Sequence, residues 1–147
     1  MILPDFAISI RQPWAWAIVA GHKPIENRSA SVAGRFRKLR GQRIAIHAAW
    51  NMADSEYEAA AAFMRARCGI DPPPPDRMWF GGIIGSALVG EVVAASSSPW
   101  FAGPFGVMLS DPQELEFVDC RGWPGVFKFE KAGARTQGDL ADRKSVV

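Results

Sequence analysis

The segment from residue 21 to residue 28 brings together a lysine, a glutamate and an arginine. Gly21, Lys23, Glu26 and Arg28 form the pattern G-x-K-x-x-E-x-R. If residues 24–28 are extended, Glu26 and Arg28 lie on one face of a strand, because side chains alternate with period two. Arginine forks onto phosphate, lysine adds a point charge, and a carboxylate accepts from the exocyclic amine of a base. We therefore expect these three residues to line a ligand cleft; the alternative is that Glu26 only pairs with Lys23 or Arg28 to hold the turn.

The same residues could also serve catalysis. A lysine is a nucleophile or a base only when it is desolvated and neutral, and a neighbouring carboxylate changes its proton affinity according to burial. Lys23 and Glu26 are therefore the catalytic candidates if the protein is an enzyme, a question that the residues themselves leave open.

Three further candidates stand just before this pattern, where a strand gives way to a helix. Arg11, Gln12 and Trp14 occupy that junction, and backbone N–H groups at a helix start face anions. Trp14 either stacks on a base or packs in the core against Ile18, and both alternatives remain open. Trp16 points away from Trp14, so the two rings are expected to face different surroundings.

Charge is unevenly distributed along the chain. Its net charge is only +2, too small to indicate a nucleic-acid partner by itself. Residues 21–43, however, carry seven basic side chains and one acidic side chain, whereas residues 111–119 carry four acids and no base. This asymmetry predicts one basic face, the alternative being a solvated loop. The phosphate-contact candidates in the basic segment are Arg35, Arg37, Lys38 and Arg40.

Other polar residues give weaker signals. His22 and His47 have no partners at metal-ligand spacing, so no metal site is predicted. Glu91 lies in a long apolar segment, and because acids are rarely buried unless paired, we expect it to face the cleft toward Lys23 or Arg28.

Hydrophobic patterning and turn residues indicate the elements that must position these side chains. A helix is predicted from Trp14 to Ala20, closed by Gly21. A second helix begins near Ser55, with Glu58 completing a capping box, and ends at Gly69. One apolar stripe of this helix is formed by Tyr57, Ala61, Met64 and Cys68. Residues 29–42 and 71–76 are predicted to be loops. Residues 24–28 are predicted to be extended. Strands are predicted at 6–10, 43–48, 83–95, 105–109, 115–119 and 125–130, with a turn at Ser110–Gln113 between two of them. The pattern favours an α+β fold, a partly closed β-barrel of about six strands with helices at its openings.

Length and composition indicate one ordered domain. The chain has 147 residues, of which 48% are apolar and 22% charged, typical of one ordered domain. We assign residues 1–130 to that domain and expect residues 131–147, which lack periodicity, to be a frayed or disordered tail. Neither a membrane span nor a secretory signal is predicted. Two widely separated cysteines favour reduced thiols and a cytoplasmic protein. No cofactor and no obligate protein partner are predicted.

The lead-in S-I-R-Q-P-W-A at residues 9–15, followed by G-x-K-x-x-E-x-R, resembles the ASCH domain family, a branch of the PUA-like barrels. Segments 41–48, 100–105 and 120–122 are similar to later parts of the family pattern, so the resemblance covers residues 6–130. It implies a barrel with a cleft beside the first helix that binds RNA, DNA or a modified nucleoside.

Some members of this family are amidohydrolases that act on N4-acylated cytidine, and others are described as metal-dependent ribonucleases. In the amidohydrolases the pattern holds a lysine and a threonine and is followed by a downstream glutamate. Here Glu26 stands in the threonine position, and no downstream glutamate aligns. The resemblance therefore implies nucleic-acid or nucleoside binding first, with hydrolysis by Lys23 as the alternative.

Overall fold

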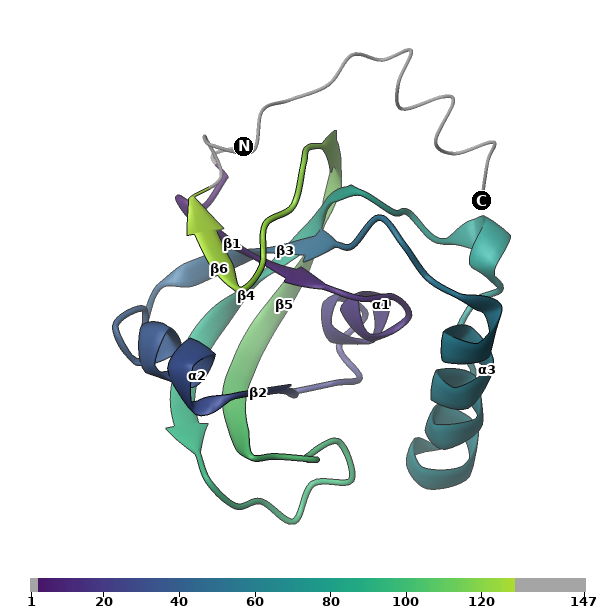
Figure 1. Cartoon of the computed structure of the whole chain (residues 1–147), viewed down its shortest axis with the longest axis horizontal. Coiled ribbons are helices and arrows are strands. Elements are labelled where there is room, and N and C mark those ends of the chain that lie inside the picture. The colour runs from purple at the N-terminus through teal and green to yellow at the C-terminus, as the bar shows by residue number, and fades with distance from the viewer. Residues whose placement is uncertain (1–2, 129–147) are drawn as a thin grey trace.

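A six-stranded sheet that curls around its own core forms the body of the protein (Figure 1). The computed structural model describes residues 3–128, so the tail expected at 131–147 lies outside the described residues. The strand order is β2-β5-β4-β3-β1-β6. The strands are β1 (Phe6–Ile10), β2 (Ile25–Arg28), β3 (Arg43–Ala48), β4 (Gly82–Val93), β5 (Phe105–Asp119) and β6 (Val126–Lys128). The helices are α1 (Trp14–Val19), α2 (Ala30–Arg37) and α3 (Asp54–Phe63).

The sheet is a partly closed barrel. Neighbouring strands are antiparallel except for β1 and β3, which run parallel, and the edge strands β2 and β6 are not neighbours in the sheet. The core joins apolar side chains from the strands to Ala15 and Ile18 of α1 and to Phe36 of α2. The predicted α+β fold with helices against a curled sheet is confirmed.

The prediction of a loop over residues 29–42 is wrong, because α2 occupies most of it. Ser29 has the extended backbone of an N-cap residue, and Ala33 and Phe36, three residues apart, are both buried. These two buried residues, with half-buried Val32 packed against the same core, dock the short helix on the barrel through one apolar face. The polar composition and Gly34 concealed this pattern.

The predicted turn at Ser110–Gln113 is also absent, since β5 runs through it as one strand of 15 residues. The strand absorbs the irregular sequence at Asp111, whose φ is +47°, and the pairing with β4 shifts register along this region. Arg43 of β3 donates to both the carbonyl and the carboxylate of Asp111. A bulge held by a cross-strand arginine thus replaces the expected hairpin.

Helix α3 stands beside α1 at the edge of the molecule (Figure 1). Tyr57, Ala61 and Met64 are buried on the predicted stripe. The expected Ser55–Glu58 capping box is not the one formed: the N–H of Ala53 donates to Glu56 Oε1 at 3.1 Å. The helix continues into a π-helical turn, Met64–Cys68, and ends at left-handed Gly69. The expected extended loop at 71–76 ends in a short 3-10 turn, Pro75–Arg77.

Close approach between α1 and the sheet depends on Gly85. A Cβ there would come within 2.6 Å of the Val19 methyl groups and of the Gln113 carbonyl oxygen. The missing side chain therefore lets α1 lie directly on the β4–β5 pair. Among the described helices, none has the length and apolar character needed to cross a membrane.

A cationic and aromatic candidate cleft

A cleft of about 630 Å³ opens where α1, β2, the end of α3 and the loop at 99–102 meet. Five of its lining side chains are charged, four of them basic and one acidic. Four more are aromatic. The charged residues are Arg11, Lys23, Glu26, Arg28 and Arg67, and the aromatic residues are Trp14, Phe63, Trp100 and Phe101.

Glu26 is the centre of the charged wall. Its Oε1 accepts from Lys23 Nζ at 2.7 Å, and its Oε2 accepts from Arg28 Nε at 2.9 Å. Lys23 Nζ also donates to the Ile25 carbonyl at 2.6 Å, and Arg28 Nη2 donates to the Ser9 carbonyl at 3.0 Å. The Lys23 side chain is only 4% exposed and that of Arg28 is 20% exposed. One carboxylate therefore fixes two cations at the base of the cleft.

The pattern combines ion pairing with a place in the wall of a cavity. Glu26 and Arg28 do share a strand face, and Glu26 does pair with its basic neighbours. All three side chains nevertheless line the cleft. The pairing orients the two cations and leaves the wall with one net positive charge.

Aromatic rings form the facing wall. Trp14 meets the rings of Phe63 and Trp100 edge to face, with centroids 5.8 Å and 6.4 Å apart, and Phe63 meets Trp100 at 6.0 Å. Trp14 and Phe101 are partly exposed, whereas Trp100 is buried. Edge-to-face packing fixes rings while leaving ring surface uncovered, so Trp14 serves both the core and the cleft.

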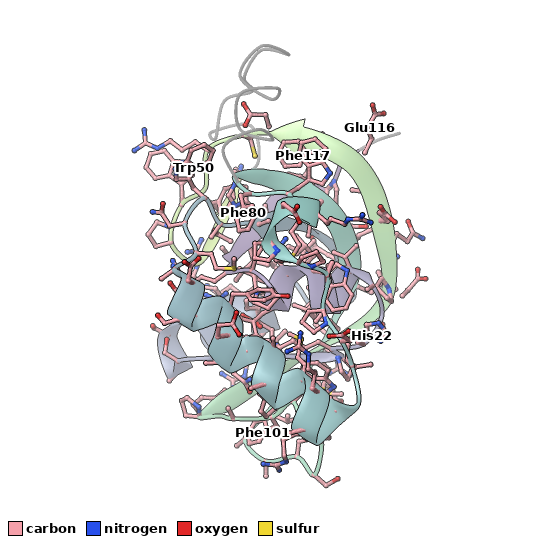
Figure 2. The ribbon with its side chains drawn as sticks, turned by 90° about the vertical axis from the view of Figure 1, so that its right-hand side faces the viewer. His22, Trp50, Phe80, Phe101, Glu116 and Phe117 are labelled. Carbon is pink, nitrogen blue, oxygen red and sulfur yellow. The ribbon has the colours of Figure 1, made fainter. Side chains whose placement is uncertain are left out.

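Asn27 of β2 holds the aromatic loop in place. Its side-chain amide nitrogen donates to the Trp100 carbonyl at 2.9 Å, and its Oδ1 accepts from the N–H groups of Ala102 and Gly103. The loop that carries Phe101 is therefore tied to the strand that carries Glu26. Figure 2 shows Phe101 and Trp50 at opposite ends of this side of the molecule.

Two arginines stand at the mouth of the cleft. Arg11 donates from Nε and Nη2 to the two carboxylate oxygens of Glu56, both at 2.6 Å. These hydrogen bonds lower the pKa of Glu56 to about 2 and raise that of Arg11. Arg67, in the π-helical turn after α3, is exposed. Both are accessible to an anionic group.

Several predicted site residues lie elsewhere. Gln12 is buried with both ends of its amide engaged: Nε2 donates to the Trp79 carbonyl at 3.0 Å, and Oε1 accepts from the Trp16 N–H at 2.8 Å. The basic candidates after β2 do not line the cleft; all four are exposed, in or just after α2. They are Arg35, Arg37, Lys38 and Arg40.

The expectation that Glu91 faces the cleft is wrong. Its side chain is 64% exposed and pairs with Arg40 at 3.0 Å. The pairing of β4 with β5 shifts register between Val89 and Val92, and Glu91 lies in this irregular segment, so Val92 packs against the core while Glu91 faces solvent.

Phe63 and Arg67 are cleft residues that the sequence did not indicate. They come from α3 and the turn after it, far along the chain from the motif. The apolar stripe predicts which face of α3 is buried, but it does not predict which element packs against that face. Asn27 and Phe101 lie within segments that resemble the family pattern. Asparagine is uncommon in strands, so its presence in an extended segment was the sequence signal that could have indicated a role for Asn27.

His47 is a buried imidazole of the sheet rather than a ligand. Its Nε2 lies 2.9 Å from the Cys120 carbonyl, so this nitrogen carries the proton, and its Nδ1 accepts from the Ser9 hydroxyl at 3.1 Å. Burial lowers its pKa. Within residues 3–128, His, Cys, Asp and Glu side chains form no group of three that could hold a metal ion.

No family model and no curated protein matches the chain. Solved structures do. An ASCH protein from Zymomonas mobilis is 15% identical, with a TM-score of 0.46, over 97% of this chain and 94% of its own. Two single-substitution variants of that protein are 16% and 15% identical, with TM-scores of 0.44 and 0.46. These three structures are thus of one ASCH protein and its variants.

Proposed function

We propose that the protein binds RNA, or a modified nucleoside within it, in the cleft beside α1. One observation carries the proposal: four basic side chains and one carboxylate face partly exposed aromatic rings in a single cavity of about 630 Å³. Phosphate, base edge and base face each have a complementary partner there.

The parts of a nucleotide divide among the walls. A base stacks on the exposed surface of Trp14 or Phe101, a contact worth about 1–3 kcal/mol per base. Arg11 and Arg67 at the mouth bind phosphate, with Arg11 exchanging the Glu56 carboxylate for a phosphate oxygen. Lys23 and Arg28, fixed by Glu26, supply positive potential at the base of the cleft.

Hydrolysis is the second candidate, favoured by the placement of Lys23 and Glu26 together in the cleft. Lys23 would have to leave its ion pair with Glu26, 2.7 Å away, before it could act as a nucleophile or base. A binding role needs no such change, and we therefore rank it first.

Binding is tested by titrating a fluorescently labelled single-stranded RNA at several salt concentrations. Arg67→Gln removes a cation of the cleft mouth, and Arg65→Gln is its matched control: it changes the same charge in the same turn, outside the cleft, where Arg65 pairs with Asp71. We expect Arg67→Gln to weaken binding about tenfold and to reduce the salt dependence, because one fewer phosphate is neutralised. Arg65→Gln is expected to change binding by less than about twofold.

Equal effects of the two variants, or RNA binding that does not depend on salt, would contradict the proposal. Incubation with N4-acetylcytidine and with labelled RNA, with and without Mn²⁺, tests hydrolysis in parallel. Turnover that Lys23→Ala abolishes would favour the enzymatic alternative, provided that this variant stays folded. DNA of the same sequence distinguishes the two nucleic acids.

A further inference from the structure

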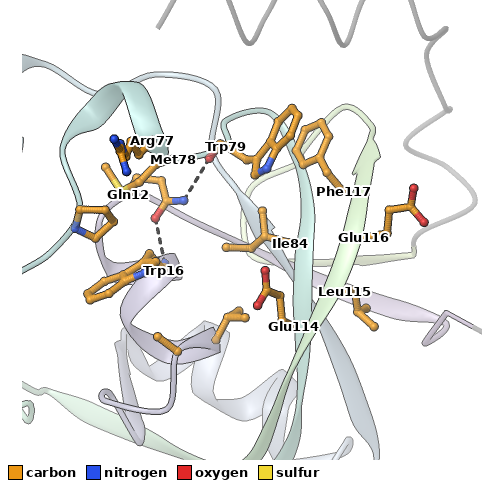
Figure 3. Close-up of a pocket in the computed structure, with 13 residues that line it drawn as sticks. Gln12, Trp16, Arg77, Met78, Trp79, Ile84, Glu114, Leu115, Glu116 and Phe117 are labelled. Carbon is orange, nitrogen blue, oxygen red and sulfur yellow. Dashed lines mark hydrogen bonds between the residues drawn. The ribbon is translucent and has the colours of Figure 1, made fainter.

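A second and larger cavity lies on the other side of α1. Its volume is about 870 Å³, and it opens between α1, the segment at 77–79 and the β4–β5 pair (Figure 3). Trp14 and Trp16, two positions apart on this short helix, line different cavities, as their spacing predicts. The motif and the proposed function account for the first cavity and leave the second without a role.

Fixed aromatic surfaces form two sides of this second cavity. Trp79 and Phe117 are stacked, with centroids 4.3 Å apart and planes 15° apart. Gly82 makes room for this stack, since a Cβ there would collide with the Phe117 ring. Gln12 ties the Trp79 backbone to that of Trp16, so the two aromatic walls are joined by hydrogen bonds (Figure 3). The walls are therefore held in place before any ligand binds.

The charge of this cavity is opposite to that of the cleft. Glu114 and Glu116 line it, and they belong to the stretch at 111–119 that holds four acids and no base. Figure 3 shows the Glu114 carboxylate pointing toward Ile84 between the walls, whereas Glu116 points away from them. Within residues 3–128 neither glutamate forms a salt bridge. Arg77 stands on the opposite side, in the 3-10 turn.

We propose that this cavity binds an arginine side chain presented by a basic segment of a partner protein. The apolar stem of an arginine fits against Trp16 and Ile84, its planar guanidinium lies on an aromatic face, and Glu114 accepts its hydrogen bonds. The acidic stretch around Glu114 attracts further basic residues of such a segment and repels phosphate. A protein segment is thus favoured over a nucleic acid here, and the proposal stands independently of the function proposed for the cleft.

The test uses a short glycine peptide that carries a single arginine, and the same peptide with citrulline, which has nearly the same shape and no charge. Both are titrated into the full chain while the six tryptophan indole N–H signals are followed by NMR. We expect the arginine peptide to shift the indole signals of Trp16 and Trp79, and citrulline to weaken that binding about fivefold or more.

Two isosteric variants localise the site. Glu114→Gln removes the inward carboxylate, and we expect it to weaken the arginine peptide about fivefold. Glu58→Gln makes the same change of charge on the exposed face of α3, outside the cavity, and we expect a change below about twofold. The proposal is overturned if the arginine peptide does not bind, if citrulline binds equally well, if the two variants behave alike, or if the signals of Trp14 and Trp100 shift instead.

Discussion

Glu26 holds the cations at the base of the cleft in position, because each of its carboxylate oxygens accepts from a different basic side chain. A carboxylate that pairs with two partly buried cations costs more stability when it is removed than a carboxylate in an exposed ion pair does. Removal of the carboxylate leaves two desolvated positive charges facing each other, whereas removal of an exposed partner leaves a charge that water solvates.

Glu26→Gln is therefore expected to lower the free energy of unfolding by about 3 kcal/mol. Glu91→Gln is the matched control, since Glu91 pairs with Arg40 and both side chains are 64% exposed; its expected cost is below about 1 kcal/mol. Urea unfolding followed by tryptophan fluorescence measures both. Similar values for the two variants would mean that Glu26 does not organise the buried cations.

The burial of His47 makes the stability of the protein depend on pH, and it fixes the direction of that dependence. Desolvation lowers its pKa from the ordinary 6.5 in the folded protein, so between the two values the unfolded chain binds a proton that the native protein does not. Stability is expected to be full above about pH 6.5 and to fall as the pH drops below it. Urea midpoints between about pH 8 and about pH 5, together with NMR of the His47 imidazole, measure this effect. Proton uptake by folded His47 at or above pH 6.5 would contradict it.

At the scale of the elements, α2 shows where local sequence signals were insufficient. Gly34 sits inside this helix, and a Cβ there would meet nothing within 4 Å. Alanine loses less backbone entropy than glycine in a helix, so Gly34→Ala is expected to stabilise the protein by about 0.5–1 kcal/mol. The contrasting variant Gly85→Ala would collide with Val19 and is expected to destabilise it. A shift of the thermal unfolding midpoint measures both, and a Gly34→Ala variant of unchanged or lower stability would argue against a helix at 30–37.

Much of this architecture was predictable from local patterns, and the exceptions have physical causes. Hydrophobic patterning identified β1, β3 and β4, and the Tyr57–Met64 stripe identified α3. The segments that differed, α2 and the middle of β5, depend on tertiary contacts: Phe36 docks a polar helix, and Arg43 holds the irregular backbone at Asp111. The G-x-K-x-x-E-x-R motif located one wall of the cleft. The periodicity within α3 could not show that Phe63 and Arg67 belong to another wall of the same cleft.

At the scale of the whole molecule, the described residues separate charges of opposite sign. The cleft and α2 carry a group of basic side chains, and β5 carries the acidic stretch. Helix α2 follows β2 after a single residue, Ser29, and the Arg37 guanidinium lies 5.7 Å from the centre of the Phe105 ring, whose residue pairs with Arg28 in the sheet. If the cleft binds a nucleotide, as we propose, a longer strand would meet positive charge beyond the cleft itself.

Variants of α2 would therefore distinguish the proposed binding of a nucleotide in the cleft from the binding of a longer strand. The double variant Arg35→Gln/Lys38→Gln removes two exposed cations that do not line the cleft. If RNA extends along α2, this variant is expected to leave the affinity for a mononucleotide unchanged, to weaken the affinity for a longer single strand, and to reduce its salt slope by about 0.7 for each phosphate that is no longer neutralised. Fluorescence anisotropy at several salt concentrations measures the slope. The matched double variant Arg65→Gln/Arg77→Gln removes the same charge outside α2 and outside the cleft. An equal reduction in slope by this control would mean that only the net charge of the protein matters. Weaker mononucleotide binding by the α2 double variant would mean that α2 acts through the cleft.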